Sequence, residues 1–457
     1  MTSTQQLEPP VGLVQSNERS AELLRRACLV TPGGVNTARR KIDPPLCIRR
    51  GQGAYVEDLD GNRYIDFHAA YGAILLGHSY PAVNRRVRQI MDEQVLFGVG
   101  TTELEVAVAE KIVAHVPGAE QVAICGSGSE ATYHAIRLAR AVTGRAKLVK
   151  FQGLYHGFHD YVLRNVISAP ERIGQRDPMS AGMLDEAVDA TLVCRYNDLE
   201  SVRETFARHG EGIAAIIVEP IAHNSSSILP GEGFLEGLRA VCDEHGALLI
   251  FDEVITGFRH ALGGYQAICG VTPDLSTFAK AIANGYPVAA VAGRKDLMEQ
   301  YNTTATGNVT FAGTYNGGAI PMAAALATIE LLETQPVHEH IFRLGERMRD
   351  GLRALAFDLG VPVVVSGYGS LYVMLFMEGP LDSYDDVIRN DQEFFVAYRT
   401  ELVRRGVLEM PENIGRNHIM FSHTDADVDR ALEISAEALR VTLRARGKPP
   451  AAAPGAW

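Results

Sequence analysis

The sequence is poor in cysteine and lysine and has no long apolar run. Its six cysteines are scattered over 457 residues and form no CxxC pair, which argues against a disulfide framework and against a thiolate zinc site. No uninterrupted apolar stretch reaches the roughly 18 residues that a membrane-spanning helix needs. The N-terminal segment is polar and shows no apolar core of a secretory signal. Together these absences predict a protein of the reducing cytoplasm.

The charge of the chain argues against two further classes of partner. A formal net charge of −12 at pH 7 argues against non-specific nucleic-acid binding and against an anionic membrane surface. Apolar residues make up 46% and charged residues 21%, which is ordinary for a globular protein and allows a large core. The length suggests two or three domain-sized units. We therefore expect a globular protein that binds neither nucleic acid nor membrane.

The stretch at 248–280 contains the most informative pair of residues. Its opening apolar run ends in Asp252, so we expect a buried strand with this carboxylate at its C-terminal end, where open α/β sheets bind ligands. The stretch closes at Lys280, one of only seven lysines, between Phe278-Ala279 and Ala281-Ile282. Because desolvation lowers its pKa, a lysine with apolar neighbours is a candidate Schiff-base nucleophile, and a nearby acid can pair with the pyridinium nitrogen of pyridoxal phosphate (PLP). A surface lysine and a turn aspartate are the ordinary alternatives.

A glycine-rich turn at 126–131 follows a predicted strand at 121–125 and precedes a predicted helix at 132–142. Free N–H groups at a helix N-terminus, with glycines that allow close backbone approach, form a phosphate site. The segment GlySerGlySerGluAla also matches the GxGxxA dinucleotide fingerprint, which predicts an NAD-type oxidoreductase instead. That fingerprint requires an acidic residue after the next strand. The strand at 148–151 is followed by Gln152-Gly153, which disfavours the dinucleotide alternative.

Three polar segments are ambiguous by themselves. The segment TyrHisGlyPheHisAsp at 155–160 offers an aromatic ring after a strand, but its histidines match no zinc-site spacing, and it could equally be a polar loop. A buried strand predicted within the segment 212–220 ends at Glu219, and Asn224 follows in a polar loop. The cluster Arg39-Arg40-Lys41 is either a solvated face or an anion site.

The pattern of apolar residues predicts two domains. A hairpin is expected from 54–58 and 63–67, helices are expected at 81–94 and 102–115, and Thr102 and Glu105 have the spacing of a capping box. From about residue 335 shorter strands and helices indicate a smaller α+β domain. We predict a large domain at 71–330, a small domain at 331–446 to which residues 1–70 contribute, and a disordered tail at 447–457.

Several motifs together resemble one family. They are GlySerGlySerGluAla, TyrHisGly at 155–157, ValGluPro at 218–220, PheAspGluValIleThrGlyPheArg at 251–259, the segment at 271–280 that ends in Lys280, and AlaGlyThr at 312–314. In this order and spacing the chain resembles a fold-type I, class III PLP-dependent aminotransferase, most closely the glutamate-1-semialdehyde 2,1-aminomutase branch. The resemblance implies an α/β fold whose large domain has a mostly parallel seven-stranded sheet, with a smaller α+β domain built from the N- and C-terminal segments.

The resemblance also implies roles for individual residues. Lys280 resembles the Schiff-base lysine and general base, and Asp252 resembles the partner of the pyridinium nitrogen. Thr314 resembles a residue that reaches the cofactor phosphate of a second subunit, which implies a homodimer. Arg40, together with Arg416, is expected to bind the substrate. The full predicted set of cofactor-binding residues is Ser127, Gly128, Ser129, Tyr155, His156, Glu219, Asn224, Asp252, Val254, Lys280 and Thr314.

Two departures from the aminomutase branch bear on the substrate. Gly415-Arg416 stands where that branch has a glutamate facing the carboxylate-binding arginine, and Gly318-Ala319 stands where it has an AsnPro pair. We therefore expect an intermolecular aminotransferase that moves an amino group between an amino acid or amine and a keto acid or aldehyde, with ping-pong kinetics. The alternatives are an aminomutase and, more remotely, the NAD-type oxidoreductase. A non-catalytic scaffold is disfavoured because Lys280 and Asp252 are both present.

Overall fold

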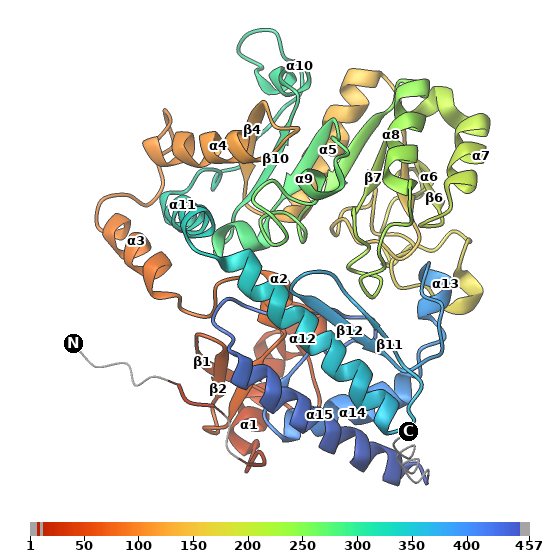
Figure 1. The fold of residues 1–457 in the computed structure, drawn as a ribbon. Helices are drawn as coiled ribbons and strands as arrows, with labels where there is room; N and C mark the ends of the chain where they lie inside the picture. The colour runs from red at the N-terminus through yellow and green to blue at the C-terminus, as the bar shows by residue number, and fades with distance from the viewer. Residues whose placement is uncertain (1–6, 10–11, 448–457) are drawn as a thin grey trace. The chain divides into compact units, whose positions relative to one another are not determined.

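The computed structural model describes residues 7–9 and 12–447, and these form two compact units (Figure 1). Unit 1 contains the residues up to Tyr80, Glu339–Pro380 and the residues from Arg389 onward. Unit 2 contains Pro81–His338 and Leu381–Ile388. The tail that the sequence predicts to be disordered lies, apart from Gly447, outside the described residues.

Unit 2 is built on a seven-stranded sheet, as predicted. Its strand order is β4-β10-β9-β8-β7-β5-β6, and only β10 runs antiparallel to its two neighbours. The strands are β4 (Gln121–Cys125), β5 (Lys147–Phe151), β6 (Thr191–Cys194), β7 (Ile213–Val218), β8 (Leu248–Asp252), β9 (Leu275–Phe278) and β10 (Ala289–Gly293). The mostly parallel arrangement brings the carboxyl ends of β5, β7, β8 and β9 to one edge of the sheet.

The central strands are continuous apolar segments because helices cover the sheet. Every residue of β7 and β8 is buried, which is typical of strands inside a parallel sheet. The buried core around them includes Ile217, Ile250, Leu275 and Val291. Asp252 ends a strand whose other residues are apolar, so the polar group lies where the core stops.

The helices of unit 2 pack on the sheet and on one another. They are α3 (Pro81–Met91), α4 (Glu103–His115), α5 (Gly128–Thr143), α6 (Asp185–Asp189), α7 (Leu199–His209), α8 (Phe234–His245), α9 (Gln266–Cys269), α10 (Lys295–Met298), α11 (Ala319–Thr334) and α13 (Tyr384–Val387). Thr102 and Glu105 form the predicted capping box of α4. Helix α5 begins at Gly128, four residues before the predicted Thr132, because Ser127 and Glu130 form a second capping box.

Unit 1 contains two small sheets and five helices among its described residues. One sheet has the order β1-β2-β3-β13, and the other has the order β11-β12-β14. Strands β2 (Tyr55–Asp58) and β3 (Arg63–Asp66) form the predicted antiparallel hairpin. The other strands are β1 (Ile48–Gln52), β11 (Val364–Ser366), β12 (Leu371–Leu375), β13 (Val407–Leu408) and β14 (Asn417–His418). The helices are α1 (Glu18–Val30), α2 (Ala69–Gly72), α12 (Val337–Asp358, whose first two residues belong to unit 2), α14 (Gln392–Arg404) and α15 (Asp425–Ala445).

Helix length and hydropathy bear on membrane association. Within residues 7–9 and 12–447, no helix combines the length and the apolar character that crossing a bilayer requires.

Candidate active site

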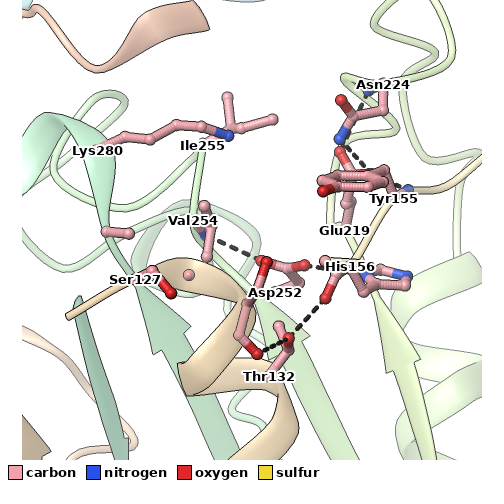
Figure 2. A pocket seen from close by; sticks show the side chains of 14 residues that line it. Ser127, Thr132, Tyr155, His156, Glu219, Asn224, Asp252, Val254, Ile255 and Lys280 are labelled. Atoms are coloured by element: carbon pink, nitrogen blue, oxygen red, sulfur yellow. Dashed lines mark hydrogen bonds and ion pairs between the residues drawn. The ribbon is translucent and has the colours of Figure 1, made fainter. Parts of the chain in front are cut away.

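A cavity in unit 2 opens at the carboxyl ends of the central strands (Figure 2). Its empty volume is about 560 Å³ including the open mouth, which leaves room for an aromatic ring and an attached phosphate. Ten of the eleven predicted cofactor-binding residues line it, from Ser127 in the β4–α5 turn to Lys280 after β9. Four lining residues were not predicted: Thr132, Gly157, Ile255 and Ala279.

Three predicted residues do not line this cavity. Thr314 lies in an exposed segment of unit 2 before α11. Arg40 and Arg416 belong to unit 1. Arg40 is exposed at the end of a short 3-10 helix, whereas Arg416 is buried and donates from Nη2 to the carbonyl oxygen of Tyr71 over 3.4 Å.

Asp252 is held in one orientation by three donors. Its carboxylate accepts from the backbone N–H of Val254 at 3.1 Å and from the Thr277 hydroxyl at 3.3 Å. The third partner is His156, whose Nδ1 lies 2.7 Å from Oδ2 of Asp252. A carboxylate oxygen accepts, so the imidazole carries its proton on Nδ1. The side chain is only 5% exposed, so Asp252 presents a fixed, desolvated acceptor to the cavity.

Glu219 supports the opposite wall of the cavity. Its Oε1 accepts from the backbone N–H of Tyr155 at 3.0 Å and from the amide of Asn224 at 2.8 Å. Burial raises the pKa of Glu219, and the nearby Asp252 raises it further, while His156 acts in the opposite sense. Glu219 therefore ties two separate loop segments to the end of β7 and positions the Tyr155 ring.

The first turn of α5 lines one end of the cavity. Oε2 of Glu130 accepts from the backbone N–H groups of Gly126 and Ser127, at 2.7 and 2.9 Å. The next N–H groups belong to the first helical turn, which lines the cavity and where an anion is favoured. A Cβ on Gly128 would lie 3.0 Å from Val254 Cγ1, and one on Gly157, whose φ is +114°, would lie 2.8 Å from Ser129 Oγ. Only glycine leaves these two positions open.

Lys280 has an uncommon backbone conformation. It follows Ala279 directly after β9 and has φ of +50°, in the left-handed region that a side chain makes costly by about 1–3 kcal/mol. Such strain is concentrated at functional sites. In Figure 2 Lys280 and Tyr155 lie on opposite sides of the view, and Asp252 lies lower, between them.

The cavity fits a phosphorylated pyridine cofactor. It combines an anion-binding helix terminus, a flat aromatic side chain at Tyr155, an apolar surface at Val254, a fixed carboxylate and a lysine amine. The dinucleotide alternative lacks its ribose acid, because Gln152 after β5 is buried and donates its amide to Ser168 Oγ and to the carbonyl oxygen of Asn165. We therefore set the NAD-type alternative aside.

Comparison with known proteins points to the same family that the sequence motifs resemble. The family model for class-III aminotransferases matches residues 37–439. A glutamate-1-semialdehyde 2,1-aminomutase of Desulfatibacillum aliphaticivorans is 39% identical over 93% of this chain and 99% of its own length. Among solved structures, a transaminase with PLP bound has a TM-score of 0.86 at 29% identity and covers 94% of this chain and 99% of its own. A β-phenylalanine aminotransferase of Variovorax paradoxus has a TM-score of 0.85 at 31% identity and covers 95% and 96%.

Proposed function

Because the chain belongs to the class III aminotransferase family and is a PLP-dependent enzyme, we propose that the cavity of unit 2 is its cofactor site and that Lys280 and Asp252 are its catalytic residues. The observation that carries this assignment is the convergence of Lys280, Asp252 and the α5 N-terminus on one cavity. Those groups come from segments up to about 150 residues apart in the chain, so their proximity is not a consequence of local sequence.

Each side chain then has a physical task. When bound, PLP supplies an electron sink for the bond that is broken in the substrate. Lys280 Nζ acts as the general base that takes the substrate's α-proton. The fixed Asp252 carboxylate would hold a proton on the ring nitrogen, and Tyr155 and Val254 would pack against the ring. The N–H groups of the first α5 turn hold the phosphate.

We propose an intermolecular amino transfer, with a keto acid or aldehyde as the acceptor. The support is Gly415-Arg416, because an added arginine in place of an acid suits a substrate with a carboxylate at that position. The acid closest in sequence, Glu412, is engaged with Arg39, whose Nε lies 3.3 Å from Oε1. Arg40 and Arg416 are the groups we assign to the substrate carboxylate.

The aminomutase is the second candidate. It is favoured by the curated relative named above, which shares 39% of its residues with this chain over almost its full length. It differs from an aminotransferase in one testable respect, because it needs no separate donor and acceptor.

We further propose a homodimer of a cytoplasmic enzyme. Thr314 does not line the cavity of its own chain and lies exposed beside Tyr315, which is 78% exposed. Val99, at 89% exposed, adds a second large apolar side chain in unit 2. A second copy of the chain would cover these side chains and bring Thr314 to its cofactor phosphate.

The deciding experiment is a half-reaction measured by visible absorption. The protein loaded with PLP is mixed with α-amino acids, β-amino acids or glutamate 1-semialdehyde, one at a time and without an acceptor. Bleaching of the cofactor band by one donor class, with recovery after a keto acid is added, is expected. Isomerisation of glutamate 1-semialdehyde without any added partner would replace the aminotransferase by the aminomutase. Lys280→Ala is the matched control, because it keeps the cavity and removes the amine.

A further inference from the structure

Lys150, another lysine of unit 2, is completely buried and does not line the cavity. It lies on β5, its side chain is 0% exposed, and its Nζ donates to the carbonyl oxygens of Leu154 at 2.9 Å and Arg164 at 2.5 Å. A buried ammonium is costly unless it is hydrogen-bonded or paired, so these two hydrogen bonds are what makes the burial of Lys150 possible. The cofactor chemistry described above does not use this amine.

The two carbonyl groups bound by Lys150 bracket the loop that carries part of the site. Leu154 immediately precedes Tyr155 and His156, and Arg164 lies at the return end of the same loop. One ammonium group therefore joins both ends of an eleven-residue loop at a single point. Joining the ends restricts the conformations of the residues between them.

The start of the loop is also held from the cavity side. Glu219 accepts from the Tyr155 N–H, Asp252 accepts from His156, and the Thr132 hydroxyl donates to the carbonyl oxygen of His156 at 2.5 Å. All three bonds act within two residues of Leu154. At the return end, Arg164 Nη1 donates to the carbonyl oxygens of Val188 and Thr191, so that end is attached to α6 and to β6. Lys150 links the two attachments together with Gly153, whose N–H donates to the carbonyl oxygen of Asn165 at 2.8 Å, and with Gln152, whose amide donates to the same oxygen at 3.2 Å.

The hydrogen bonds of Lys150 do not depend on its charge. Burial lowers the pKa of Lys150 to about 7. The charge of Arg164 lowers this pKa as well, and the carboxylate of Glu219 acts in the opposite sense. A neutral amine still has two N–H groups, which is the number that the two carbonyl acceptors need. The link therefore survives loss of the proton.

We propose that Lys150 is a positioning residue of the cofactor site, which closes the loop at 154–164 and thereby fixes the Tyr155 ring and the His156 imidazole against the cavity. This inference rests on the cofactor site proposed above. Loss of the link frees the carbonyl oxygens of Leu154 and Arg164 and loosens the loop, so the ring support and the His156–Asp252 bond lose part of their fixed geometry.

Lys150→Met tests this inference, with Lys147→Met as the matched control on the same strand. Lys147 is partly exposed and contacts His209 instead of the loop. For Lys150→Met we expect a rise of about tenfold in the Kd for PLP, because two buried acceptors lose their donor. We also expect faster amide hydrogen exchange at 155–163 and an altered pH midpoint of the cofactor's visible band. Lys147→Met should stay within about twofold of the wild type in Kd.

The controls separate this inference from the site assignment. If the wild type and Lys147→Met fail to bind PLP, the proposed cofactor site is wrong. If they bind and Lys150→Met matches them in Kd, exchange and band midpoint, the positioning role is refuted even when the variant melts earlier. Lys150→Gln keeps two N–H donors and should recover part of the affinity. If neither variant folds, amide hydrogen exchange at 155–163 in the wild type tests the positioning role. Protection equal to that of β5 supports the role, and rapid exchange overturns it.

Discussion

Gly157 gives the sharpest test of the proposed phosphate end of the cavity. Its φ of +114° is unfavourable for any residue with a Cβ, and the added atom of Gly157→Ala would lie 2.8 Å from Ser129 Oγ and 3.0 Å from Ser129 Cα. The first cost is conformational, about 1–3 kcal/mol of unfolding free energy. The second cost arises because the added atom crowds Ser129 in the first turn of α5, so this turn and the loop at Gly157 must move apart. Misplacing one charge-assisted hydrogen bond of that turn, worth about 1.5–3 kcal/mol, raises the Kd for PLP about 10- to 100-fold.

Gly182→Ala is the control for the conformational cost. Gly182 has φ of +84°, and a Cβ added there would meet no heavy atom within 4 Å, so its substitution strains the backbone without displacing a neighbour. Both variants should unfold at lower urea concentration, and only Gly157→Ala should lose cofactor affinity in an absorbance titration of the apoprotein. Equal Kd values for the two variants would refute the placement of the phosphate at the first turn of α5.

Three further changes test other parts of the site. Lys280→Ala should abolish turnover while its melting temperature stays within a few degrees of the wild type, and retained turnover by steady-state assay would remove Lys280 from its role. Asp252→Asn should lower kcat on the order of 100-fold or more, because the amide replaces the charge that we propose pairs with the ring nitrogen, and a loss below tenfold would contradict that role. Burial, aided by His156 and Arg140, lowers the pKa of His159 to about 4. As the pH falls, His159 therefore stays neutral in the folded protein, whereas in the unfolded chain, where a histidine has a pKa near 6.5, it binds a proton. The stability that this group contributes above pH 6.5 is therefore lost as the pH falls toward 4, by about 2.5 kcal/mol at pH 4.5. In His159→Gln the free energy of unfolding should consequently fall less between pH 7 and 4.5 than in the wild type. An equal fall in the two proteins would contradict the lowered pKa.

Much of the fold could be predicted because its central strands are apolar runs that end in polar residues. The run before Asp252 and the run before Glu219 both form buried strands of the sheet. Parallel strands share one carboxyl edge, so residues that follow them meet there whatever their distance in the chain. The cavity lining therefore contains ten residues that the sequence motifs indicate, and their roles stay predictions.

The features that the sequence does not predict depend on contacts between distant segments. Strand β9 is not evident in the sequence because Ser276 and Thr277 interrupt its apolar character, although all four of its residues are buried. The bond between His156 and Asp252 joins residues 96 positions apart, and nothing in local periodicity specifies it. The predicted start of α5 is four residues late because glycines usually mark a turn, although Ser127 and Glu130 have the spacing of a capping box.

The neighbouring carboxylates Asp252 and Glu253 face different surroundings. Asp252 lines the cavity, whereas Glu253 is fully buried and accepts from the Thr256 hydroxyl at 2.5 Å and from the backbone N–H groups of Tyr265 and Gln266 at 2.7 and 3.0 Å. One residue thus faces the cavity and the next one anchors the following loop. Laboratory evolution of this enzyme should consequently tolerate point changes around β8 far better than insertions or deletions, because a shift of one residue would exchange ligand-facing and anchoring positions at once.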